Sequence, residues 1–128
     1  MKKNILRVIA LGLMMIILCV LLSACSHMSN PNKTVKALEN AGYVVVYNDG
    51  EGEFNASTLP KGAKASIMAY KGQDNIHIIY YEDAATADDA WEDIKQIAEF
   101  NKDKEGFVCE KSGRVIYYGT AQAVEDAE

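Results

Sequence analysis

Hydrophobic residues recur along this chain with two different periods, and turn-forming residues separate the segments. Apolar side chains are spaced three or four residues apart over residues 31–41 and, most regularly, over 83–101. This spacing predicts two helices that each bury one side against a core. Asn30-Pro31 is a typical start for the first helix, and Gly42 is a typical end. We expect Thr34 to face solvent.

Five further segments are rich in β-branched and aromatic residues and are predicted to be strands. Gly72-Gln73-Asp74 separates the second strand from the third, and Ser112-Gly113 separates the fourth from the fifth, so each pair reads as a hairpin. Residues 54–62 show no clear period and are expected to form a loop. The strands are predicted over residues 43–47, 64–71, 75–82, 107–111 and 114–118.

The predicted order of elements is α-β-β-β-α-β-β-(α), with a short last helix over residues 120–126. Hairpins favour antiparallel neighbours, and two helices with apolar faces require a sheet to cover. The predicted fold class is therefore α+β: a two-layer sandwich with a mainly antiparallel sheet. The small side chains of Ala65 and Ala69 indicate that a helix lies close against the second strand.

The first 24 residues differ in character from the rest. Lys2, Lys3 and Arg7 form a basic head, an uncharged apolar run covers residues 8–22, and small residues precede Cys25. These three zones are typical of an export signal. The apolar run is short for a membrane span, which needs roughly 20 residues. An uncleaved transmembrane anchor and a cleaved signal without lipid are the two alternatives.

The segment Leu22-Ser23-Ala24-Cys25 resembles the lipobox of bacterial lipoproteins, which is an aliphatic residue, two small residues and a cysteine. The resemblance implies that a diacylglyceryl group is attached to the Cys25 thiol and that a type II signal peptidase cuts between Ala24 and Cys25. Two acyl chains suffice for stable anchoring. The mature protein is then expected on the outer side of the cell membrane, or at the outer membrane of a cell with two. The predicted regions are a signal peptide (1–24), a lipidated cysteine with a polar tether (25–30) and a single domain (31–128).

Charge is distributed unevenly between the signal and the predicted domain. The first 24 positions hold three of the 13 basic residues and none of the 18 acidic residues, which leaves a net charge of −8 for the remainder. This balance argues against nucleic acid as a partner, because phosphate binding needs clustered lysine and arginine. It also indicates that a covalent lipid, rather than charge, holds the protein at the membrane.

Candidate catalytic and metal-binding residues are few. His77 and Cys109 stand alone on predicted strands, without the spacing of a zinc site or an evident partner for nucleophilic catalysis. The acidic residues of 88–93 are interpreted as the beginning of a helix, and those of 49–53 as a solvated turn. The sequence contains no phosphate-binding loop and no nucleophile elbow. We therefore expect no metal, no cofactor and no catalytic residue.

Tyrosines on the predicted strands point to a candidate interaction face. Because neighbouring residues on a strand point to opposite faces, we expect helices on one face and aromatic side chains on the other. Tyrosine is favoured at interfaces, so this outer face is a candidate surface for a protein partner or a second copy of the chain. Ordinary packing on a solvated face is the alternative. The residues assigned to the outer face are Met68, Tyr70, His77, Ile79 and Tyr81.

The chain also loosely resembles small uncharacterised lipoproteins of Gram-positive bacteria. The likeness rests on the lipobox, the ending Val115-Ile-Tyr-Tyr-Gly-Thr120 and the alanine-rich helix of 83–101, and it implies no known activity. The leading hypothesis is a membrane-anchored, non-catalytic binding or interaction module. A small-ligand-binding accessory lipoprotein of a transporter or envelope enzyme is the first alternative, and a hydrolase that uses His77 is the second.

Overall fold

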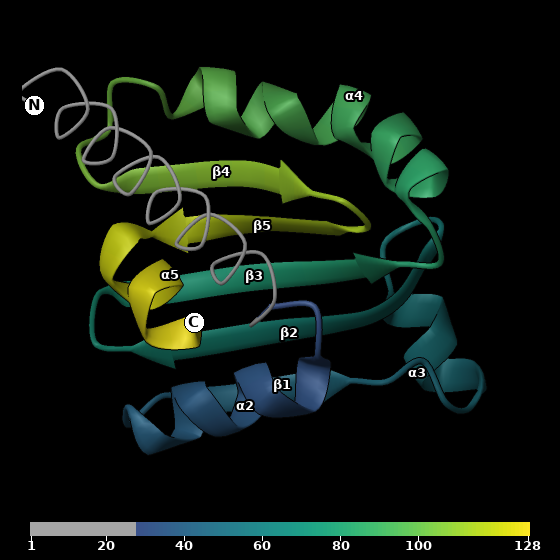
Figure 1. Cartoon of the computed structure of the whole chain (residues 1–128), viewed down its shortest axis with the longest axis horizontal. Coiled ribbons are helices and arrows are strands. Elements are labelled where there is room, and N and C mark those ends of the chain that lie inside the picture. The colour runs from purple at the N-terminus through teal and green to yellow at the C-terminus, as the bar shows by residue number, and fades with distance from the viewer. Residues whose placement is uncertain (1–27) are drawn as a thin grey trace, which may run out of the picture.

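Four helices and five strands occur within residues 28–128, the part of the chain that the computed structural model describes. The predicted signal peptide and Cys25 lie outside these residues. In chain order the elements are α2 (Pro31–Asn40), β1 (Val44–Asn48), α3 (Glu53–Thr58), β2 (Ala63–Lys71), β3 (Asp74–Tyr81), α4 (Ala84–Phe100), β4 (Phe107–Ser112), β5 (Val115–Thr120) and α5 (Ala121–Ala127). The strands form one sheet in the order β1-β2-β3-β5-β4, and every neighbouring pair is antiparallel (Figure 1).

The predicted α+β class and antiparallel sheet are confirmed, and α2 begins where its capping residue indicated. The Asn30 side-chain oxygen accepts hydrogen bonds from the main-chain N–H groups of Asn32 at 3.1 Å and Lys33 at 3.4 Å. One prediction about this helix is wrong. Thr34 is only 1% exposed, because it lies one helical turn before Leu38 and therefore shares its core-facing side.

Helix α3 lies in the segment that was expected to be a loop. All of its residues are exposed. The Asn48 side-chain amide donates to the main-chain oxygen of Asn55 at 2.9 Å and to the hydroxyl of Thr58 at 3.0 Å, which holds the helix beside the end of β1. A six-residue helix without a buried stripe leaves no periodic signal in the sequence.

The larger core lies between the sheet and the helices α2 and α5. Alternate residues of β2 and β3 point into it, together with Leu38 of α2 and Ala123 of α5, both 0% exposed. Ala65 and Ala69 are buried here as well, as expected for a strand that helices approach closely. The Tyr43 hydroxyl donates to a carboxylate oxygen of Asp126 at 2.9 Å, and this bond ties the chain before β1 to α5.

A smaller core on the opposite face of the sheet is covered by α4. Ile79 and Tyr81 of β3 and Ile116 of β5 point to this face, where Ala87 and Trp91 of α4 pack against them. Because successive strand residues alternate between faces, α4 lies on the other side of the sheet from α2 and α5. The predicted sandwich therefore gains a partial third layer over β3, β5 and β4.

The folded domain begins before the predicted boundary. Met28 is 5% exposed and belongs to the core formed with α2 and α5. Arg114 donates to the main-chain oxygen of Ser29 at 3.4 Å, and Asn30 caps α2. Residues 28–30, which were predicted to belong to a polar tether, are therefore held by the domain.

Candidate functional site

Helix α4 divides the predicted interaction face into a covered part and an uncovered part. Ile79 and Tyr81 are 2% and 1% exposed beneath α4, so their assignment to an exposed surface is wrong. Ile79 and Tyr81 do lie on the predicted outer face of β3. The alternation of residues along the strand could not show that a helix covers this part of the face. Met68 and Tyr70 are exposed, at 38% and 46%, and His77 is half-buried.

The uncovered part of this face continues onto the edge strand β1. Val44 pairs with Tyr70, and Val46 pairs with Met68, which places all four side chains on one face. Val44 is 69% exposed and Val46 is 57% exposed. We call Val44, Val46, Met68 and Tyr70 the open patch. All four are uncharged and apolar or aromatic, and contiguous exposed side chains of this kind are candidates for a binding surface.

The sequence pattern did not identify Val44 and Val46 as part of the site. The run Val44-Val45-Val46 has no alternation of polar and apolar residues that would separate an inner from an outer face. Only the pairing with β2 does so, because Val45 lies opposite the buried Ala69 and packs against the core. One signal was available: β1 has neither lysine nor proline, which natural edge strands use to avoid pairing with other chains.

A row of polar and polarizable side chains crosses the sheet beside the open patch. Met68 pairs with His77, His77 with Tyr118, and Tyr118 with Cys109. The Nδ1 atom of His77 and the hydroxyl of Tyr118 share a hydrogen bond of 2.7 Å, and their rings meet edge to face at 5.2 Å between centroids. Burial lowers the pKa of His77 and raises the pKa of Tyr118, so both side chains are neutral near pH 7.

This row does not assemble a Cys–His nucleophile. Cys109 lies two strands away from His77, or about 10 Å at the usual strand spacing, and Tyr118 occupies the position between them. Burial raises the pKa of the Cys109 thiol, which keeps it protonated and weakly nucleophilic. Within residues 28–128, no group of three or more acidic, histidine or cysteine side chains is placed to hold a metal ion.

A separate cleft of about 420 Å³ lies where the loop before β2 meets the first turns of α4. It is bordered by the Gly62 backbone, the ring of Tyr81 and several charged side chains at the surface. The polar residues that line it are Lys61, Thr86, Asp89 and Asp93.

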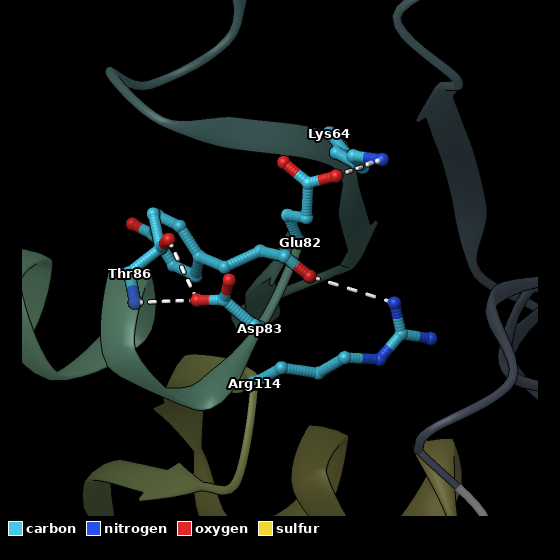
Figure 2. A network of polar contacts seen from close by, with 6 residues as sticks. Lys64, Glu82, Asp83, Thr86 and Arg114 are labelled. Atoms are coloured by element: carbon cyan, nitrogen blue, oxygen red, sulfur yellow. Dashed lines mark hydrogen bonds and ion pairs between the residues drawn. The ribbon is translucent and has the colours of Figure 1, made fainter.

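The polar contacts at this end of the sheet stabilise local structure (Figure 2). Asp83 accepts hydrogen bonds from the main-chain N–H of Thr86 at 2.8 Å and from its hydroxyl at 2.7 Å, which caps α4. These two bonds lower the pKa of Asp83. Lys64 and Glu82 form an exposed ion pair at 3.1 Å. The polar groups in these contacts find their partners within the domain, so their arrangement does not require a ligand.

Comparison of the chain with family models, curated proteins and solved structures finds no match. No helix within residues 28–128 is long and apolar enough to cross a membrane.

We expect mild acid to destabilise the domain through His77. Its pKa in the folded state is lowered by burial from the ordinary value of 6.5. The unfolded chain therefore binds a proton at a higher pH than the folded domain does, and stability is lost as the pH falls from 6.5 toward the folded pKa. Urea denaturation at about pH 7.5 and about pH 5.5 measures this loss. His77→Phe should reduce the difference between the two conditions, and an unchanged difference in that variant would contradict the assignment.

Proposed function

We propose that this protein is a lipoprotein, anchored outside the cytoplasm by a diacylglyceryl group on Cys25, and that its domain is a non-catalytic module that binds a protein partner through the open patch. The signal-like N-terminus and the lipobox Leu22–Cys25 support the anchor. The observation that supports binding is the open patch itself: four large uncharged side chains, exposed on neighbouring strands of a strongly acidic domain.

The composition of the open patch suits contact with another protein. Apolar area removed from water contributes about 25 cal/mol per Å², and the exposed parts of Val44 and Val46 supply such area. Tyr70 and Met68 belong to the residue types enriched at protein interfaces, and methionine adapts its shape to a partner. The neutral hydrogen-bonded pair of His77 and Tyr118 lies beside the patch, where polar groups at an interface rim provide specificity.

The anchor is tested by Cys25→Ser. The substitution removes the sulfur that would carry the diacylglyceryl group, so we expect no incorporation of a labelled fatty acid and no removal of the signal peptide. Metabolic labelling and gel mobility measure the two effects. Cys109→Ser is the matched control, and it should be labelled and processed normally. Normal labelling and processing of Cys25→Ser would refute the proposed anchor.

Binding at the open patch is tested by photo-crosslinking in intact cells. A photoreactive amino acid at Tyr70 is expected to give a defined adduct, whereas the same amino acid at Gln122, exposed on α5, should not. Val46→Asp places a charge within the patch and should abolish the adduct at position 70. The mass of the adduct distinguishes a different protein from a second copy of the chain.

Two outcomes of the crosslinking experiment would contradict this proposal. Adducts of similar abundance at positions 70 and 122, or an adduct at position 70 that survives Val46→Asp, would show that the open patch is not the binding surface. The Val46→Asp protein must remain folded for the comparison to hold, and circular dichroism of the same preparation checks this.

The small-ligand alternative would use the cleft beside α4. Its volume of about 420 Å³ lies within the range of small-molecule sites. Lys61, Asp89 and Asp93 in its lining are all exposed and therefore solvated by water. We favour the open patch, because exposing its apolar side chains to water is unfavourable, whereas the charged side chains of the cleft are well solvated.

A further inference from the structure

The first described residues are fixed on one side of the sheet. Met28 packs into the core that also contains Ala127 of α5. Arg114 donates to the main-chain oxygen of Ser29 at 3.4 Å. Its other terminal nitrogen donates to the main-chain oxygen of Tyr81, also at 3.4 Å (Figure 2). In Figure 1 the described chain begins beside α5, on the side of the sheet where α2 and α5 lie. Buried contacts therefore set the point at which the chain enters the domain.

The segment between the proposed anchor and this entry point is very short. Cys25 precedes Met28 by three residues, with Ser26 and His27 between them. Fully extended, the segment spans at most about 11 Å. A domain of about 100 residues has a radius of gyration of about 13 Å, so the segment is shorter than the domain is wide. A lipid on Cys25 would therefore keep the Met28 side of the domain at the bilayer surface.

The open patch lies on the other side of the sheet. Val45 packs against the core that contains Met28, and its neighbours Val44 and Val46 point the opposite way. Packed layers of a protein lie about 10 Å apart, as in stacked sheets. A short segment that starts on the side of α2 and α5 cannot bring the open patch to the bilayer unless Met28 leaves the core.

The charges near the entry point indicate which part of this side approaches the membrane. Lys33 and Lys36 are exposed on α2, and Lys36 lies on the side of the helix opposite to the buried Thr34. The exposed acids Glu125, on α5, and Glu128, directly after it, would be repelled by anionic headgroups, whereas the lysines of α2 would be attracted to them. The first turns of α2 are therefore the part that approaches the headgroups.

We propose that the short segment after Cys25 holds the α2 and α5 side of the domain against the membrane, with α2 nearest the headgroups and the open patch facing away. The inference rests on the proposed lipid anchor and adds an orientation to it. The occupant of the α2 side is the bilayer surface. The open patch then remains free for a protein, and it is not a membrane-insertion surface.

The orientation is tested with the complete lipoprotein, processed in cells and reconstituted into vesicles of phosphatidylcholine and phosphatidylglycerol that contain a nitroxide headgroup lipid. A fluorophore is attached at Asn32→Cys on α2 or, in a second sample, at Val44→Cys in the open patch, both in a Cys109→Ser background. We expect the fluorophore at position 32 to lose most of its emission and the fluorophore at position 44 to retain most of it.

A lengthened segment provides the matched control. Inserting about ten glycine and serine residues between His27 and Met28 adds a root-mean-square reach of about 17 Å without changing the lipid. The difference in quenching between positions 32 and 44 should then shrink. Equal quenching at the two positions of the original protein, stronger quenching at 44, or a difference unaffected by the insertion would overturn the proposed orientation. Failure of the anchor itself is recognised separately, because a protein without the acyl group would wash off the vesicles.

Discussion

Gly119→Ala is expected to unfold the domain or to destabilise it severely. A Cβ atom at this position would lie 2.8 Å from the Cα of Ile76 and closer still to the main-chain oxygen of Asn75. Both contacts are with backbone on the paired strand β3, which cannot move without breaking the centre of the sheet. We expect a loss of about 3 kcal/mol or more, the upper end of what overpacking costs. Urea denaturation should show a midpoint roughly 2 M lower.

Gly72→Ala is the control for this prediction. Gly72 has a φ of +60° in the turn between β2 and β3, and a Cβ atom there would meet nothing within 4 Å. The only cost is that of a left-handed backbone conformation with a side chain, about 1 kcal/mol. Similar denaturation midpoints for the two variants would show that close approach of the strands does not determine the requirement for glycine at position 119.

Ile79→Asp is expected to have an effect of comparable size for a different reason. Ile79 is 2% exposed and packs in the cluster of Tyr81, Ala87 and Ile116 beneath α4. A carboxylate introduced there would lose its water without gaining a partner, and substitutions of this kind rank among the most destabilising. We expect a loss of about 4 kcal/mol or more, measured as loss of the folded signal in circular dichroism.

Val46→Asp makes the same kind of change on the same face of the sheet. Val46 is 57% exposed in the open patch, so the new carboxylate would stay solvated. Its cost should be limited to the lower strand propensity of aspartate, about 1 kcal/mol. A folded Ile79→Asp variant would contradict the burial of this face by α4, and an unfolded Val46→Asp variant would show that the open patch is part of the core.

The sequence alone predicted the elements whose signals are local. The helix expected over residues 83–101 is observed as α4, Ala84–Phe100, with Asp83 as its capping residue and Asn101 at its end. The two hairpins form around the turns that were identified, because glycine and short polar residues determine turn geometry within a few positions. Helix α3 was not predicted, because all of its residues are exposed and it has no apolar stripe.

The candidate site depended on information that is not local. Ile79 and Met68 share one face of the sheet, yet α4 buries the first and leaves the second exposed. Which part of a face a helix covers depends on the order of the strands and the path of the connections, and neither follows from the period of a single segment. The same holds for Val44 and Val46, whose outward direction follows only from pairing with β2.

Cys25 and Met28 separate the two kinds of information most clearly. The lipobox is a linear pattern of four residues, so the sequence by itself yields the prediction of a lipid anchor, and Cys25 lies outside the residues that the structure describes. Met28 is the one apolar side chain within residues 26–30, but a single apolar residue in a polar segment has no period that would predict its burial. Its burial is decided by the tertiary structure, because only the packing of α2 and α5 on the sheet creates the apolar space that it fills.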